Sequence, residues 1–174
     1  MSLHDCHHNF HELATFVLPA YMEKMRFEIA RPKSMGDFAR PAVGVATLIK
    51  ELGIAKDFSG CYVLLAAGVP IYVGISRGVI GRLRQHVFGK THFDASLAFR
   101  MARHEHNDKV IAKLNRGKAM QDEQFLKSFT EAQRKLRSLK VAYIEIANPL
   151  ELYVFEAYCA LELDTHQWNS FETH

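Results

Sequence analysis

The first third of the chain has apolar residues at close to helical spacing, interrupted by helix breakers. Phe10, Leu13, Val17 and Tyr21 recur at about every third or fourth position, which is typical of an amphipathic helix. Prolines and a glycine between positions 32 and 41 end this pattern, and a shorter helical pattern follows at residues 43–52. We therefore predict that residues 1–57 form a mainly helical N-terminal extension.

The pattern then changes to that of a β-hairpin. Residues 60–75 form two short runs that are rich in β-branched and aromatic residues and flank a turn. From residue 78 to residue 89 the period is helical, with Val79, Leu83 and Val87 on one face. This order predicts two paired strands followed by a helix.

The second half of the chain predicts further helices and one more strand. Residues 95–140 are helical in pattern and basic, and residues 140–147 alternate as a strand does. Asn148 and Pro149 then resemble an N-cap and a first-turn proline, and Glu151 completes a capping-box spacing. We predict an α+β fold with a small three-stranded sheet flanked by helices, in a domain of residues 58–174 that follows the helical extension.

Composition narrows the class of protein. With 174 residues, 48% of them hydrophobic, the chain is long enough for one compact domain with its own core. Its three cysteines are scattered and fit no disulfide or zinc spacing, which favours reduced thiols in a cytoplasmic protein. We expect neither a signal peptide nor a membrane helix, because no apolar run is long and unbroken enough.

Charge is unevenly distributed along the chain. Residues 77–140 contain 15 basic and 6 acidic residues, a balance of +9, whereas residues 141–174 contain no basic and 6 acidic residues. A basic segment of this kind is a plausible contact for a nucleic-acid backbone, although a solvated helical surface has the same composition.

Histidines and a cysteine gather near the N-terminus, at His4, Cys6, His7, His8 and His11. His7 and His11 would be one turn apart on a helix, but two histidines alone make a poor zinc site. We therefore expect these residues to be surface polar groups.

Six positions with a defined order and spacing resemble the GIY-YIG nuclease superfamily. The first motif reads Gly60-Cys61-Tyr62 and the second Tyr72-Val73-Gly74, with ten residues from tyrosine to tyrosine. A further ten lead from Tyr72 to Arg82, and His86 follows four later. The late glutamate and asparagine of the family match Glu156 and Asn169. Cys61 and Val73 replace the isoleucines of the motifs but keep an apolar side chain.

The resemblance covers roughly residues 58–171 and implies a GIY-YIG-like fold with an antiparallel sheet. It also implies hydrolysis of a DNA phosphodiester with one divalent metal, Mg²⁺ or Mn²⁺, held by Glu156. Arg82 would neutralise charge on the phosphoryl group, and Tyr62 would accept the proton of the attacking water while Tyr72 orients it. His86 would contact a phosphate or assist the proton transfer, and Asn169 would hold the site together.

Helical geometry places two of these residues on the same flank of the helix at residues 78–89. At about 100° per residue, Arg82 and His86 project together from one flank of the apolar face, and Arg84 projects from the other. An arginine beside an imidazole at the rim of a sheet suits a phosphate oxygen. The alternative is an exposed basic flank without a ligand.

The late helix is almost wholly apolar, and Glu156 shares its face with Leu152, Ala160 and Leu163. A carboxylate among apolar neighbours is costly unless it is paired or binds a metal. We predict a metal ligand, with a buried structural salt bridge as the alternative.

Several points stay open at this stage. The two motif tyrosines face the same side of the sheet only if the turn preserves their register. Asn169 could equally cap nearby backbone. We expect DNA contacts from four basic residues of the middle segment, Arg84, Lys113, Arg116 and Lys118. The competing interpretations are a DNA-binding module of the same fold without activity, and an unrelated α+β protein with chance motifs.

Overall fold

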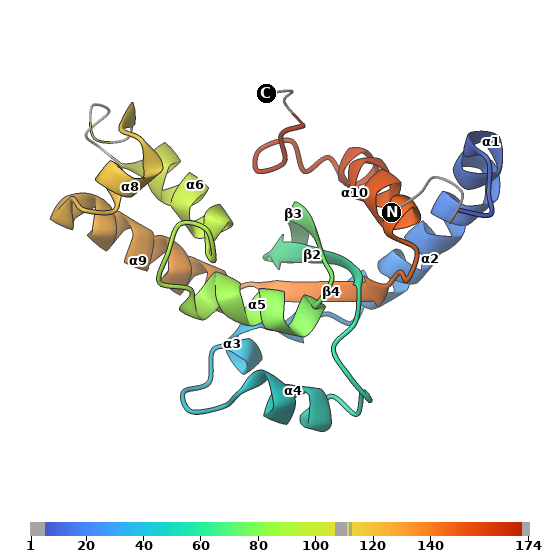
Figure 1. The fold of residues 1–174 in the computed structure, drawn as a ribbon, viewed down its shortest axis with the longest axis horizontal. Helices are drawn as coiled ribbons and strands as arrows, with labels where there is room; N and C mark the ends of the chain where they lie inside the picture. The colour runs from blue at the N-terminus through green and yellow to red at the C-terminus, as the bar shows by residue number, and fades with distance from the viewer. Residues whose placement is uncertain (1–5, 107–110, 112, 172–174) are drawn as a thin grey trace.

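The computed structural model describes residues 6–106, 111 and 113–171, and it is an α+β fold around a four-stranded antiparallel sheet (Figure 1). The strands are β1 (Lys33–Ser34), β2 (Gly60–Ala66), β3 (Val69–Ser76) and β4 (Lys140–Glu145), in the order β1-β4-β2-β3. The sequence predicted three of these strands. The short β1 was missed, and it places part of the N-terminal segment in the sheet by pairing with β4 at Val141 and Lys140.

The hairpin β2–β3 follows from its turn. Ala67 and Gly68 both have positive φ, 49° and 84°, which is the backbone of a tight type I′ turn. Along β2, Cys61 and Val63 pack on one face of the sheet and Tyr62 and Leu64 on the other, as the two-residue period of a strand requires. The strand is buried on both faces, so the sheet separates two hydrophobic cores.

The larger core contains the helices that follow the hairpin. These are α5 (Val79–Phe88), α6 (Ser96–Glu105), α8 (Arg116–Ala119) and α9 (Glu123–Ser138), together with the earlier α3 (Met35–Phe38) and α4 (Val45–Glu51). The predicted helices at residues 43–52 and 78–89 are confirmed as α4 and α5. Leu97, Phe99, Phe125 and Leu136 are buried in this core.

The smaller core lies on the opposite face of the sheet. It is covered by the π-helical turn η2 (Leu13–Val17) and α2 (Leu18–Ile29), and by α10 (Pro149–Glu162); the short α1 (Phe10–Glu12) precedes η2 and has no buried residue. Figure 1 shows α10 and α2 on one side of the sheet and α5, α6 and α9 on the other. The side chain of Asn148 caps α10 through the backbone N–H groups of Leu150 and Glu151, as predicted. No helix of the described part of the chain combines the length and apolarity needed to cross a membrane.

Candidate active site

The two motif tyrosines lie on the same face of the sheet, which answers the question of register. Tyr62 pairs with Gly74 and Leu64 pairs with Tyr72 across the β2–β3 ladder, and the only shift comes after Leu64. Both tyrosines therefore point into the larger core, with ring centroids 6.2 Å apart. Tyr62 is 1% exposed and Tyr72 is 7% exposed.

The glycines of the two motifs are required by close approaches. A Cβ on Gly74 would lie 2.5 Å from both Cζ and Oη of Tyr62, and a Cβ on Gly60 would lie 2.1 Å from the carbonyl oxygen of Ile144. Real Cβ atoms do not approach other heavy atoms so closely. Gly74 thus leaves the space in which the phenol of Tyr62 lies across the neighbouring strand, and a side chain there would displace the tyrosine.

His86 is completely buried beneath the tyrosines instead of standing at the rim of the sheet. Its Nε2 lies 2.7 Å from the hydroxyl oxygen of Tyr62, and its ring contacts Tyr62 and Tyr72 edge-on, with centroids 5.6 and 6.2 Å away. Its Nδ1 has no hydrogen-bond partner among the described residues. The predicted phosphate contact of His86 therefore does not fit this position, whereas its alternative role in proton transfer does.

Burial determines the ionisation of His86 and Tyr62. It lowers the pKa of His86 from 6.5 to about 3, with the nearby positive charges of Arg82 and Arg100 acting in the same direction. Burial also raises the pKa of Tyr62 well above its ordinary value, against the opposing charge of Arg82. At neutral pH the pair is thus a neutral phenol and a neutral imidazole, so one N–H or O–H donates across the 2.7 Å contact.

The buried neutral His86 predicts a specific loss of stability in acid. Its folded pKa of about 3 lies below the ordinary value of 6.5, so the unfolded chain takes up this proton first as the pH falls. The contribution of neutral His86 to the free energy of unfolding is complete above pH 6.5, and it should have fallen by about 3 kcal/mol at pH 4. The free energy of unfolding, measured by urea denaturation from pH 7 to pH 4, should fall more steeply for the wild type than for His86→Gln. Equal slopes for the two proteins would contradict the buried neutral state.

Arg82 lies on α5 one turn before His86 and directs its guanidinium toward the segment that leads into α6. It donates to the carbonyl oxygen of Asp94 at 2.7 Å, to Oγ of Ser96 at 2.9 Å and to Oε1 of Gln85 at 3.2 Å. All three acceptors are neutral, so the charge of Arg82 is held in place without being paired.

Arg84 leaves α5 from the opposite flank, as the helical phase predicted. Its Nη1 donates to the carbonyl oxygens of Phe38 and Arg40, at 3.0 and 3.4 Å, and its guanidinium lies over the ring of Phe88. These contacts tie α5 to α3. Arg84 therefore has a structural role, whereas the sequence had predicted only a contact with DNA.

Arg100 is a second cation of the site, and sequence reasoning missed it. Its guanidinium lies 5.5 Å from the centroid of the Tyr72 ring and donates to the carbonyl oxygen of Trp168 at 2.8 Å. It also lowers the pKa of Tyr72 against the larger effect of burial, which raises it. The signal in the sequence was weak, because Arg100 lies on α6 among several other basic residues.

Asn169 joins the C-terminal segment to the edge of the sheet. Its Oδ1 accepts from the backbone N–H of Val73 at 2.9 Å, and its Nδ2 donates to the carbonyl oxygen of Val73 at 2.8 Å. The Asn169 side chain thus bonds the backbone N–H and C=O groups of Val73 at the open edge of β3, as a neighbouring strand would. The next residue back, Trp168, accepts from Arg100 through its carbonyl oxygen. Asn169 therefore binds backbone, as the alternative interpretation expected, although the backbone is that of a strand far away in the sequence.

Glu156 approaches from the other side of β3, since α10 packs with the smaller core. Burial raises its pKa, and the positive charge of Arg100 acts against that rise; Glu156 in turn raises the pKa of Tyr72. Among the described residues its carboxylate has no hydrogen bond and no ion pair, so the alternative of a structural salt bridge finds no partner there. The six residues therefore gather around the edge strand β3 instead of lining a single face of the sheet.

Asp57 supports the helix that carries Arg82 and His86, and it too was missed. Its carboxylate accepts from the backbone N–H groups of Ile80 and Gly81, both at 2.9 Å, at the start of α5. A carboxylate at a helix N-terminus is stabilised by the free N–H groups and by the helix dipole. Because Asp57 lies 23 residues before Ile80, no local pattern could identify it.

The other predicted DNA contacts lie near α8, on the side of α6. Lys113, Arg116 and Lys118 are exposed, and the guanidinium of Arg116 lies 5.8 Å from the Phe99 ring. Arg116 also lowers the pKa of Arg103, although less than burial does. Several positive charges therefore lie close together on α6 and around α8.

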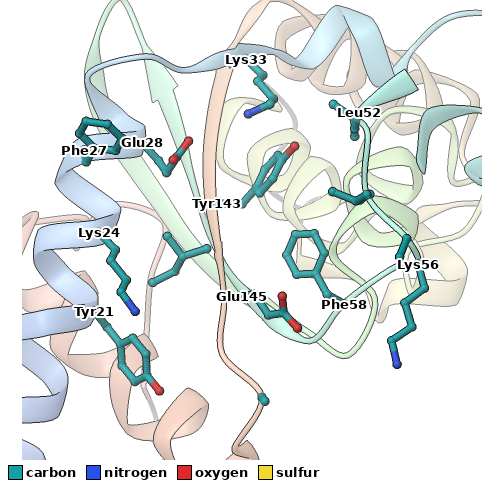
Figure 2. Close-up of a pocket in the computed structure, with 14 residues that line it drawn as sticks. Tyr21, Lys24, Phe27, Glu28, Lys33, Leu52, Lys56, Phe58, Tyr143 and Glu145 are labelled. Carbon is teal, nitrogen blue, oxygen red and sulfur yellow. The ribbon is translucent and has the colours of Figure 1, made fainter. Parts of the chain in front are cut away.

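A hollow of the surface lies apart from these residues. It has a volume of about 900 Å³ and lies over the outer part of β4, between α2 and residues 52–58. Figure 2 shows Phe58 beside Tyr143, with Lys33 above them and Lys24 on the helix opposite. None of the six motif residues lines it.

No family model, no curated protein and no solved structure matches this chain. The resemblance to the GIY-YIG nucleases therefore rests on the sequence motifs alone.

Proposed function

We propose that this protein is a divalent-metal-dependent endonuclease that hydrolyses phosphodiester bonds in DNA. The observation that carries the proposal is the gathering of Tyr62, Tyr72, His86, Arg82 and Glu156 around one edge strand. These residues come from four elements, β2, β3, α5 and α10, and each supplies a group that phosphodiester hydrolysis uses.

The two arginines favour an anionic substrate. Arg82 and Arg100 donate only to neutral oxygens, and neither forms an ion pair with a described acidic residue. Two fixed cations that form no ion pair stabilise a phosphodiester and the charge that develops on it during displacement. Burial is the main cause of the lowered pKa of His86, and a bound phosphate would offset the smaller effect of the two arginine charges, which would make that imidazole a better base.

Tyr62 and His86 provide a route for the proton of the attacking water. A phenol whose pKa is raised is not ionised at neutral pH, so it needs an acceptor for its own proton. The Nε2 atom of His86, 2.7 Å away, is that acceptor when Tyr62 donates to it. Tyr62 then takes a proton from water as it passes its own to His86, and Tyr72 orients the water.

Glu156 fits a divalent cation. It is a half-buried carboxylate with a raised pKa and no partner among the described side chains, and Mg²⁺ is often held by one or two carboxylates together with waters and substrate phosphates. When bound there, Mg²⁺ or Mn²⁺ would polarise a phosphate oxygen and stabilise the leaving 3′-oxygen. Arg100 would then face the substrate beside the metal ligand.

The proposal is tested by incubating the full chain with supercoiled plasmid DNA and Mg²⁺, with Glu156→Gln as the control. We expect nicked and linear products from the wild type and none from the variant. DNA binding without cleavage by the wild type would support the inactive DNA-binding module. If the wild type neither binds nor cleaves DNA, the motifs are a chance coincidence in an unrelated α+β protein.

Loss of Arg82 should affect cleavage more than loss of Arg84. Arg82→Ala should reduce the cleavage rate by about 10²–10³-fold, because a fixed donor is lost as charge develops on the phosphoryl group. Arg84→Ala should keep the rate and instead lower the melting temperature, since it loses the contacts to Phe38 and Arg40. Single-turnover cleavage and thermal melts of both variants separate the two effects. Equal losses of rate would mean that the two flanks of α5 are not distinct.

Binding to DNA should weaken steeply with salt. If four or five cations of residues 77–140 meet phosphates, the plot of log affinity against log salt concentration should have a slope of about −4. The triple variant of Lys113, Arg116 and Lys118 to alanine should flatten that slope without changing the rate of cleavage at saturating DNA. A slope near zero for the wild type would show that these basic residues do not meet the DNA backbone.

A further inference from the structure

A group of metal-ligating side chains lies apart from the candidate active site, at the start of α10. Sγ of Cys6, a ring nitrogen of His8 and a carboxylate oxygen of Glu151 all lie within 4.8 Å of one another. Nδ1 of His8 is 3.0 Å from Oε1 of Glu151, and Cys6 donates to the carbonyl oxygen of His8 at 3.5 Å. The three residues come from two segments that are more than a hundred positions apart.

Glu151 occupies an unusual position for a first-turn glutamate. Its spacing from Asn148 predicted a capping box, yet its carboxylate oxygens contact His8 and Tyr21, and the residue is only 6% exposed. Oε2 accepts from the hydroxyl of Tyr21 at 2.6 Å, which holds the carboxylate with Oε1 toward His8. A ligand oriented by an outer hydrogen bond of this kind is typical of protein metal sites.

We propose that Cys6, His8 and Glu151 form a Zn²⁺ site that ties the N-terminal segment to α10. Thiolate, imidazole and carboxylate are the three ligand types that Zn²⁺ takes in proteins, and three protein ligands leave one position for water. Oxygen-preferring Mg²⁺ is not suited to a site with a thiolate. From the sequence, this N-terminal cluster was expected to be polar surface groups and not a zinc site. His7 and His11, the pair at helical spacing, are exposed and lie outside the group, and His4 lies outside the described residues.

Binding at this site is balanced by the release of a proton. The thiol of Cys6 loses its proton to solvent as the sulfur–zinc bond forms, and His8 binds as the neutral imidazole. The affinity for Zn²⁺ should therefore fall as the pH is lowered. With Zn²⁺ at about 100 times its dissociation constant, the folding equilibrium should shift about 100-fold toward the folded state.

The test uses the full chain, stripped of metal by a chelator and dialysed, with no DNA present. Titration with Zn²⁺ against a competing chelator should give one ion per chain and a higher melting temperature. Co²⁺ in place of Zn²⁺ should show the charge-transfer absorption of a thiolate ligand. Cys6→Ser and His8→Ala should each weaken binding by more than about 100-fold, and Tyr21→Phe, which removes only the outer hydrogen bond, by about 10–100-fold.

His11→Ala is the matched control, because His11 is an exposed histidine on α1 outside the group. It should bind Zn²⁺ as the wild type does, and so should the cleavage-deficient Glu156→Gln, which separates this site from the proposed nuclease function. No Zn²⁺ bound at micromolar concentrations, or equal affinity in Cys6→Ser and the wild type, would overturn the proposal. The three side chains would then be a hydrogen-bonded tether without a metal.

Discussion

Tyr62→Phe is expected to reduce the rate of DNA cleavage by about 10²–10⁴-fold, the range for loss of a general acid or base. The ring and its packing against Tyr72 and Gly74 are kept, and only the hydroxyl that lies 2.7 Å from His86 is removed. The variant loses one buried hydrogen bond and leaves Nε2 of His86 without its partner, at a cost of about 1–3 kcal/mol in stability. The rate should thus fall far more than the folded population does.

Tyr143→Phe is the matched control for this result. Tyr143 lies directly opposite Tyr62 on β4 and belongs to the same sheet face, and its ring contacts Phe58 and Lys33. Single-turnover rates at saturating Mg²⁺ and DNA should be unchanged in Tyr143→Phe. If Tyr62→Phe cleaves normally and Tyr72→Phe does not, the roles of the two motif tyrosines are reversed.

The parts of the fold that could be predicted are those encoded by local patterns. The hairpin follows from alternation and a two-residue turn, α5 from an apolar stripe and α10 from its Asn148-Pro149 start. Strand β1 has only two residues, too few for any alternation, and it forms because β4 offers an edge. Its existence depends on tertiary pairing and not on its own residues.

The candidate site was predictable where side chains belong to spaced motifs, and not where they meet through the fold. Helical phase placed Arg82 and Arg84 on opposite flanks of α5, and the structure bears this out. The same helical phase predicted His86 at the boundary between the core and the surface. In the structure His86 packs beneath Tyr62 and belongs to the core. Arg100 and Asp57 contact the site through segments 68 and 23 residues away, which no periodicity encodes.

The carboxylates of α10 show the same limit. Three of them lie on an apolar helix, and the pattern singled out Glu156 as the one among hydrophobic neighbours. In the structure Glu151 is the more buried, but Tyr21 and His8 satisfy it, whereas Glu156 is half-buried and has no partner among the described residues. Burial alone therefore does not distinguish the two carboxylates. Glu151 lies with two other potential Zn²⁺ ligands, whereas Glu156 belongs to no such group among the described residues.

Glu156→Gln should leave the metal-free protein at least as stable as the wild type at pH 7, while removing Mg²⁺ binding and DNA cleavage. Its folded pKa is raised by burial, so the folded state favours the protonated carboxyl and carries a cost once the carboxylate ionises. Glutamine keeps the shape without the charge, so the variant avoids that cost. The stability difference should therefore appear as the pH rises through the raised pKa, and it should vanish in acid.

Glu162→Gln is the control on the same helix, because its carboxylate is exposed and pairs with Arg26 at 3.0 Å. It should keep both Mg²⁺ binding and cleavage. A structural role for Glu156 predicts the opposite for stability, since removing one partner of a buried ion pair costs about 3–5 kcal/mol. Thermal melts of the wild type and both variants, with and without Mg²⁺, measure the difference directly. If Glu156→Gln melts well below the wild type in the absence of metal, the carboxylate holds the fold together and another group must bind the ion.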